Sequence, residues 1–132
     1  MSVRALLART DASKAEIRLH VEREFGYALD ATLDDLRADY RFDVTCQGSV
    51  PQTIRAFLEA ESYEEAVRNA ISLGGDADTM ACIAGGIAEA FFGGVPEAIR
   101  EQTLARLDGR LRGVVLEFAA RHGGRPAPRG GA

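Results

Sequence analysis

The sequence has few of the residues that build disulfide frameworks, zinc sites and membrane spans. It contains no tryptophan, two histidines and two cysteines among 132 residues. Cys46 and Cys82 lie far apart and belong to no CxxC or Cys/His cluster, which excludes a zinc site of the usual spacing and favours a reducing, cytoplasmic setting. The longest apolar run, residues 80–95, contains Glu89 and is shorter than the roughly 20 residues of a membrane helix. The N-terminus lacks the apolar stretch of a secretory signal. We therefore expect no membrane segment.

Charge adds little evidence for a polyanionic partner. The net charge is −4, and hydrophobic residues make up 46% of the chain, as in an ordinary globular protein. Residues 1–100 hold 17 acidic and 10 basic side chains, whereas residues 101–132 hold 3 and 6. This mildly basic C-terminal region is typical of a solvated face, and we expect no nucleic-acid binding.

Helix signals dominate the chain and predict an all-α fold in one domain over residues 1–122. Ser13 and Glu16 form a capping box, as do Ser62 and Glu65. Further helix starts are expected at Thr32, at Ser49-Val50-Pro51, at residues 76–79 and at Pro96. Residues 40–46 alternate apolar and polar side chains, which predicts one short extended segment with a buried face. The Gly- and Pro-rich residues 123–132 predict a disordered tail.

The segment that carries chemistry runs Gly74-Gly75-Asp76-Ala77-Asp78-Thr79 and leads into a helix of small residues. Asp76, Asp78 and Thr79 offer only oxygen donors, which hard cations such as Mg²⁺ and Mn²⁺ prefer. The two glycines allow a sharp turn and a close ligand approach. At a helix start, free N–H groups also favour an anion such as a diphosphate.

A purely structural interpretation of the same residues stays open. Asp and Thr are preferred helix N-caps, and Gly-Gly commonly ends a helix. The segment is not an EF-hand, because it lacks the required glycine offset and closing glutamate. Residues alone therefore allow either a metal-binding turn or a helix cap.

The pattern resembles a known family. Gly-Gly-Asp-x-Asp-Thr at 74–79, an Ile-Ala-Gly-Gly-Ile-Ala helix at 83–88 and Phe91-Phe92-Gly93 are similar to the C-terminal signature of the ADP-ribosylglycohydrolases. Residues 49–58 and 66–73 resemble the same family. The resemblance implies an all-α fold around two adjacent Mg²⁺ or Mn²⁺ ions. It also implies hydrolysis of the glycosidic bond that joins ADP-ribose to an acceptor.

Site residues follow from the resemblance by motif. It implies that Asp76, Asp78 and Thr79 are metal ligands, with Asp78 bridging both ions. It further implies that two glycine-containing turns border the ADP-ribose pocket: Gly74, Gly75, Gly48 and Ser49.

The chain also departs from the family pattern. Family members are longer, and their N-terminal half carries an acidic-glycine motif and a Thr-Asp-Asp triplet that completes the metal site. Here Asp34-Asp35 follows Leu33 instead of a threonine. We therefore expect the chain to correspond to the C-terminal half, truncated, as a gene fragment, one half of a split enzyme or a shortened version of a longer chain.

Two functions follow from these departures. The chain either contributes half of a di-metal site and needs a separate N-terminal half, or it is a non-catalytic helical interaction module or pseudo-enzyme. Self-association is expected in either case, because a half-domain leaves apolar surface uncovered. The acceptor stays open among arginine, serine and small ADP-ribose esters.

Overall fold

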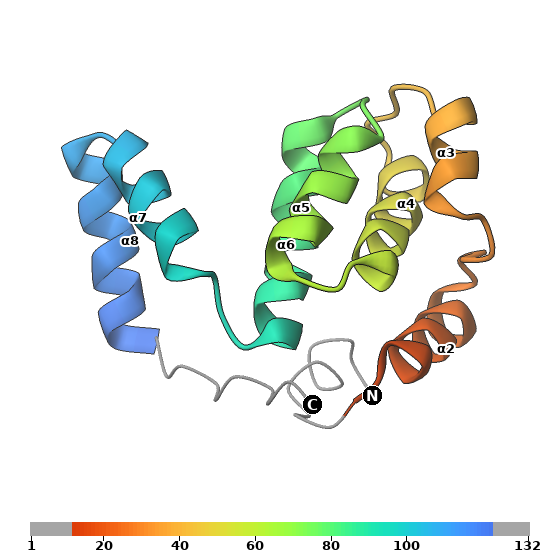
Figure 1. Ribbon diagram of the computed structural model, residues 1–132, viewed down its shortest axis with the longest axis horizontal. Helices are drawn as coiled ribbons and strands as arrows, with labels where there is room; N and C mark the ends of the chain where they lie inside the picture. The colour runs from red at the N-terminus through yellow and green to blue at the C-terminus, as the bar shows by residue number, and fades with distance from the viewer. Residues whose placement is uncertain (1–11, 123–132) are drawn as a thin grey trace.

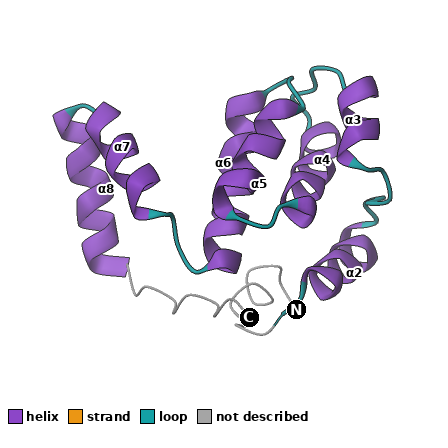
Figure 2. Ribbon diagram, in the orientation of Figure 1, coloured by secondary structure: helices purple, strands orange, loops and turns teal. Residues whose placement is uncertain are grey.

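The structure, a computed structural model, describes residues 12–122 as an all-helical protein (Figure 1). The described part consists of helices joined by loops and contains no strand (Figure 2). The predicted tail at 123–132 lies outside the described residues. The helices are α2 (Lys14–Phe25), α3 (Leu33–Asp39), α4 (Cys46–Glu59), α5 (Tyr63–Ser72), α6 (Ala77–Phe92), α7 (Glu97–Arg106) and α8 (Gly109–His122). The all-α prediction is confirmed.

The helix starts follow the predicted capping residues at three places. Ser13 caps α2 together with Glu16, and Thr32 caps α3 in the same reciprocal way with Asp35. The Ser62 hydroxyl accepts the Glu65 N–H at 3.1 Å and caps α5. These bonds satisfy amides that a helix start leaves without partners, so short local motifs determine where the helices begin.

Helices α4, α5 and α6 pack side by side and form the centre of the molecule (Figure 1). The close approach of α6 to α5 depends on small side chains, because Ala84, Gly85 and Ala88 are buried. A Cβ atom on Gly85 would lie 3.2 Å from the Tyr63 hydroxyl, so even alanine would require a shift of a few tenths of an ångström between α6 and the Tyr63 side chain. Phe57 of α4 is fully buried and contacts Phe91 edge-to-face at a centroid distance of 5.2 Å.

The segment before α4 corrects two predictions. Residues 40–45 form a loop and no strand, with extended backbone angles at Tyr40 and Thr45, and the buried face is absent: Phe42 and Val44 are 68% and 71% exposed. Helix α4 begins at Cys46 instead of Ser49, because the Thr45 hydroxyl accepts the Gly48 N–H at 3.0 Å and caps the helix earlier. Pro51 consequently lies inside α4. The alternating pattern therefore predicted neither the exposure of Phe42 and Val44 nor the helical conformation of Cys46.

His20 is a buried polar residue. It lies on the side of α2 that also carries Ile17 and Val21. Positions 17, 20 and 21 share one helix face, and that face packs on the core. The Nε2 atom of His20 has no hydrogen-bond partner among the described residues.

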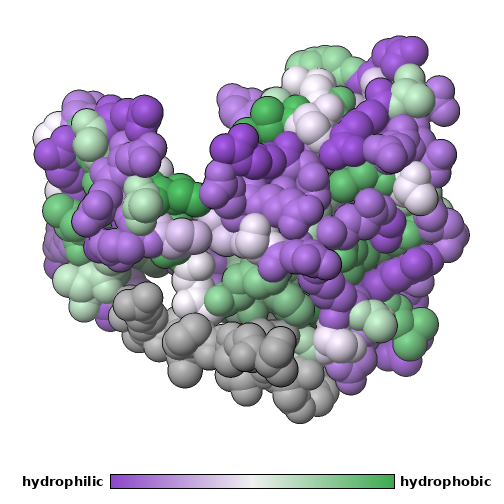
Figure 3. Space-filling view, in the orientation of Figure 1, coloured by the Kyte–Doolittle hydropathy of each residue, from purple (hydrophilic) through white to green (hydrophobic). Residues whose placement is uncertain are grey.

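Helices α7 and α8 form a hairpin that stands apart from the α4–α6 centre (Figure 1). An open notch separates the two parts in the space-filling view (Figure 3). The single helical region predicted from Pro96 is divided at residues 107–108, since Asp108 accepts the Leu111 N–H at 2.9 Å and starts a new helix. Neither helix contains a buried residue. Among the described residues, no helix is long and apolar enough to cross a membrane.

Candidate functional site

The Gly-Gly-Asp turn connects α5 to α6 and places two carboxylates at the start of α6. Gly74 and Gly75 have φ angles of +75° and +63°, in the left-handed region that a side chain disfavours. These two glycines end α5 and reverse the chain. Asp76 and Asp78 follow at the N-terminal end of α6, where unpaired N–H groups and the helix dipole stabilise negative charge.

Asp76 occupies the N-cap position of α6 but does not act as a cap. Its side chain accepts no hydrogen bond from the helix amides, in contrast to Ser13, Thr32, Thr45 and Ser62 at the starts of α2, α3, α4 and α5. The structural interpretation of the motif needs a capping bond at this position. Its absence leaves the Asp76 carboxylate available for another role.

The two carboxylates interact with each other. The pKa of Asp78 lies below its usual value because of hydrogen bonding with the Asp76 side chain and then with the Thr79 N–H, whose nitrogen lies 3.0 Å from Asp78 Oδ1. Asp78 and Thr79 are exposed and Asp76 is half-buried. Two neighbouring carboxyl groups at one turn offer oxygen atoms that a single cation could contact together.

Tyr40 packs against this turn, although it lies far away in the sequence. A Cβ atom on Gly75 would lie 2.7 Å from Cε1 of Tyr40, so Gly75 is required by the tyrosine ring as well as by its own φ angle. Tyr40 is half-buried against the core cluster to which Leu73 and Met80 belong. Its hydroxyl oxygen is buried and has no hydrogen-bond partner among the described residues. No local signal in the sequence predicted this contact.

The second predicted substrate turn, Gly48-Ser49, lies at the same end of the helices as the Gly-Gly-Asp turn (Figure 1). Its groups are used internally. A Cβ atom on Gly48 would overlap the Asp43 carboxylate, and the buried Ser49 hydroxyl donates to the Asp43 carbonyl oxygen at 2.8 Å. Asp43 also accepts the Thr45 N–H at 2.7 Å. The segment before α4 thus contacts both turns, through Asp43 at Gly48 and through Tyr40 at Gly75. A role of Gly48 and Ser49 in substrate binding stays a prediction.

The donor set can be compared with what a hard cation requires. Within residues 12–122, no group of three or more histidine, cysteine, aspartate or glutamate side chains is arranged to hold a metal ion. Asp76 and Asp78 supply two carboxylates, and Thr79 adds a hydroxyl. Mg²⁺ takes about six oxygen ligands and commonly keeps several waters. The three oxygen donors therefore fit Mg²⁺ or Mn²⁺ chemically, but they would fill only some of the ligand positions around the ion.

The fold and the turn define a class: an all-helical protein with a glycine-rich, carboxylate-bearing turn at the start of a small-residue helix. The model of the ADP-ribosylglycohydrolase family matches residues 2–127, and the chain belongs to that family. The match begins at residue 2 and does not confirm the narrower prediction that the chain is the C-terminal half alone. No curated protein and no solved structure matches the chain significantly.

Proposed function

We propose that this chain is an ADP-ribosylglycohydrolase that uses Mg²⁺ or Mn²⁺ to hydrolyse the glycosidic bond between ADP-ribose and an acceptor. The observation that carries the proposal is the Asp76 carboxylate, which occupies a helix N-cap position without capping the helix. A second carboxylate, Asp78, lies within hydrogen-bonding reach of it. Family membership supports the reaction class, and the turn supports the cation.

Each residue of the turn has a role in this proposal. Asp76, Asp78 and Thr79 would hold the metal through their side-chain oxygen atoms. The backbone of Gly74 and Gly75 would lie against the ADP-ribose, since neither residue has a side chain to exclude it. The N–H groups at the start of α6 would face the negative charge of the diphosphate. Gly48 and Ser49, in the first turn of α4, would border the ADP-ribose pocket beside the segment that ends at Thr45.

Bound divalent ions would supply Lewis-acid activation of a water molecule and orientation of the ribose hydroxyls. The chain's own part is to keep Asp78 ionised and to fix the turn. The hydrogen bonds that lower the pKa of Asp78 serve the first purpose, because they favour its ionised form. The contact between Tyr40 and Gly75 serves the second.

We also propose that catalysis needs ligands from a further polypeptide segment, either a separate N-terminal half or another part of a longer protein. Two carboxylates and one hydroxyl leave most positions around each ion to water. The isolated chain is therefore expected to bind Mn²⁺ with a dissociation constant in the millimolar range or weaker, and to show no turnover alone.

The test measures Mn²⁺ binding by the isolated chain and then the hydrolysis that a second polypeptide restores. Mn²⁺ broadening of amide NMR signals in the isolated chain should centre on residues 74–79 and be lost in Asp78→Asn, which keeps the shape but removes the charge. Glu89→Gln, an exposed carboxylate on the same helix, is the matched control and should change nothing. ADP-ribosyl-arginine and ADP-ribosyl-serine peptides should then be hydrolysed when a polypeptide bearing the Thr-Asp-Asp half is added. Equal Mn²⁺ broadening in wild type and Asp78→Asn would contradict the metal-ligand roles.

The alternative function is a non-catalytic helical interaction module. The incomplete donor set within residues 12–122 is the observation that favours it. In that case the chain would bind ADP-ribose or a protein partner without Mn²⁺, and no added polypeptide would restore hydrolysis. Isothermal titration with ADP-ribose, with and without Mn²⁺, distinguishes the two functions.

A further inference from the structure

The ammonium group of Lys14, in the first turn of α2, lies among three phenylalanine rings of other helices. Its Nζ atom is 5.8 Å from the ring centroid of Phe57, 5.8 Å from that of Phe91 and 5.7 Å from that of Phe92. An ammonium group within about 6 Å of a ring centroid is attracted by the negative face of the ring. Three such contacts at one nitrogen atom form an aromatic cage around a cation.

The walls of the aromatic cage come from α4 and from the end of α6. Phe57 is fully buried, and Phe91 and Phe92 are half-buried. The three rings contact one another edge-to-face, at centroid distances between 5.0 and 6.4 Å. These contacts involve α4 and α6 alone, so they hold the rings in place independently of the lysine.

A backbone carbonyl completes the cage. The Lys14 ammonium donates a hydrogen bond to the carbonyl oxygen of Ala60, the C-cap residue of α4, where the helix dipole favours positive charge. Burial lowers the pKa of Lys14, and the nearby negative charges of Glu61 and Glu65 act against that shift. No carboxylate within residues 12–122 forms an ion pair with Lys14. Rings and a carbonyl oxygen therefore hold this charge.

The sequence uses lysine at this position and nowhere else. Among 16 lysine and arginine residues, Lys14 is the single lysine. An ammonium group is compact and has three N–H donors that can turn toward different neighbours, whereas the planar guanidinium of arginine stacks flat on a ring. Three rings and a carbonyl oxygen around one nitrogen atom therefore match an ammonium group.

The aromatic cage lies where α2 joins the rest of the protein. Helix α2 lies at the edge of the molecule (Figure 1). Its residues Ile17 and Val21 pack in the same core cluster as Phe57 and Ala60. The Gly-Gly-Asp turn lies at the opposite end of α6, so the cage is separate from the proposed metal site. Lys14 is thus a charged contact beside the apolar contact of the same helix.

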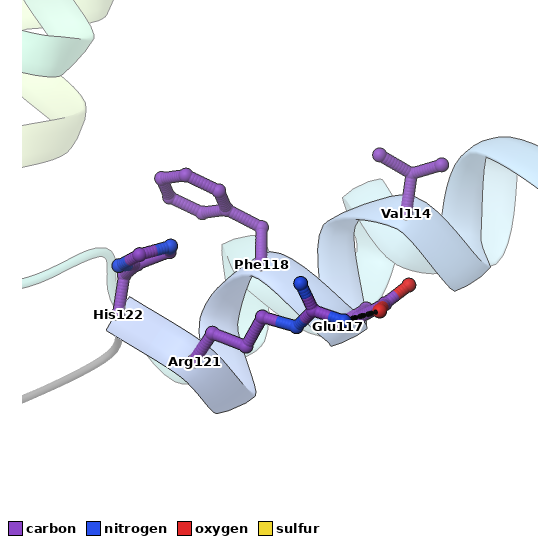
Figure 4. Close-up of a pocket in the computed structure, with 5 residues that line it drawn as sticks. All are labelled: Val114, Glu117, Phe118, Arg121 and His122. Carbon is purple, nitrogen blue, oxygen red and sulfur yellow. Dashed lines mark hydrogen bonds and ion pairs between the residues drawn. The ribbon is translucent and has the colours of Figure 1, made fainter.

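The hollow on α8 shows by contrast what distinguishes the cage. Phe118 and His122 contact each other there, with ring centroids 4.8 Å apart, and side chains of α8 alone line the hollow (Figure 4). The aromatic cage is instead built by two helices and filled by a third. Its ligand is therefore visible in the structure.

We propose that the three rings and the Ala60 carbonyl form a binding site for a primary alkylammonium group, that Lys14 is its intramolecular ligand, and that the bound ammonium anchors α2 to α4 and α6. The site selects for positive charge, because a neutral group of the same shape gains no attraction to the ring faces and a weaker hydrogen bond. Loss of the charge would release α2 by local unfolding while the α4–α6 centre stays folded.

Amide hydrogen exchange of the full chain, resolved by helix, tests the anchoring role. Lys14→Met keeps an apolar stem of similar length but removes the charge. Exchange in α2 should become at least about tenfold faster, while exchange in α5 stays unchanged. Arg23→Met is the matched control and should leave α2 exchange unchanged. It removes a positive charge from the same helix, at a side chain that is 74% exposed and pairs with the neighbouring Glu24.

Lys14→Ala empties the aromatic cage and tests its chemical selectivity. n-Propylammonium reproduces the lysine side chain beyond Cβ and should slow α2 exchange in this variant, but not in wild type, at constant ionic strength. Its dissociation constant should be on the order of 10 mM, because four heavy atoms make little contact. 1-Propanol has the same length without the charge and should not slow the exchange.

The single lysine allows a further test in the unsubstituted protein. The CεH₂ protons of Lys14 give an NMR signal that no other lysine can be confused with. Shielding above the ring faces should move this signal upfield of the usual lysine position. Phe92→Leu, which keeps an apolar side chain but removes one ring, should reduce that shift.

Four results would overturn the proposal. A Lys14 signal at the usual lysine position in wild type would mean that the ammonium does not occupy the cage. Unchanged α2 exchange in Lys14→Met, or an equal effect of Arg23→Met, would show that the Lys14 charge does not anchor the helix. Equal acceleration of α2 and α5 in Lys14→Met would exclude a local release of α2. Equal effects of propylammonium and 1-propanol on Lys14→Ala, or no effect of either, would exclude a site selective for ammonium.

Discussion

Replacement of Gly75 by alanine should destabilise the protein for two reasons that the structure separates. The first is backbone strain, since alanine at φ +63° costs about 1–2 kcal/mol. The second is a steric clash, because the new Cβ would lie 2.7 Å from Cε1 of Tyr40. Moving a packed ring to relieve such overpacking costs about 1–3 kcal/mol. We therefore expect Gly75→Ala to lower the free energy of unfolding by about 2–5 kcal/mol.

Gly74 provides the matched control for this prediction. Its φ of +75° imposes the same kind of strain, but no atom lies within 4 Å of the Cβ position. Gly74→Ala should therefore cost only the backbone part, about 1–2 kcal/mol. The difference between the two variants isolates the contact with Tyr40.

The assay is urea unfolding followed by circular dichroism, with a double-mutant cycle. Tyr40→Ala should make Gly75→Ala no more costly than Gly74→Ala, because the clash disappears with the ring. Equal losses for Gly74→Ala and Gly75→Ala in the Tyr40 background would refute the contact. So would a cycle with no coupling between positions 40 and 75.

Two further predictions concern neighbouring groups. Tyr40→Phe removes a buried hydroxyl without a partner among the described residues, so the melting temperature should stay the same or rise; a clear fall would show that the hydroxyl is paired. Bonds from Thr32 lower the pKa of Asp35 and bonds from Thr45 lower that of Asp43, so their stabilisation is present above pH 3.8 and is lost as the pH falls through the lowered values. Urea unfolding between pH 5 and pH 2 should show this loss, and Asp43→Asn should reduce it; an unchanged pH profile in that variant would contradict the role of Asp43.

Local signals predicted most of the helices. The hydroxyls of Ser13, Thr32 and Ser62 act within one turn of their own positions, so their effect is visible in a short stretch of sequence. Before α4 the sequence offers two capping hydroxyls, and the prediction of a start at Ser49 was wrong because Thr45 caps the helix.

Tertiary contacts account for what the sequence missed. Tyr40 meets Gly75 across 35 positions, and no periodicity links the two. The alternation over residues 40–46 predicted a buried face, but only Tyr40 and Asp43 turn inward, toward the two glycines whose missing side chains accommodate them. On α8, the apolar periodicity was correct, but periodicity indicates that a face needs a partner and does not identify the partner.

The choice between a helix cap and a metal ligand at Asp76 leads to a last prediction. A capping aspartate contributes about 0.5–2 kcal/mol, and its replacement by alanine loses that amount. Because the Asp76 side chain makes no capping bond, Asp76→Ala should cost no more than the helix-dipole contribution, about 0.3–1 kcal/mol.

Ser62→Ala is the reference for a residue that does cap, and it should cost about 1 kcal/mol through loss of the 3.1 Å bond to the Glu65 N–H. Urea unfolding of both variants, with Mn²⁺ broadening of the Thr79 amide signal measured on the same samples, compares the two roles directly. We expect Ser62→Ala to lose stability and keep the Mn²⁺ broadening of the Thr79 signal. Asp76→Ala should lose that broadening and cost less stability than Ser62→Ala. If Asp76→Ala is as destabilising as Ser62→Ala and leaves the Mn²⁺ effect intact, the carboxylate is a cap, and the proposed metal site loses its first ligand.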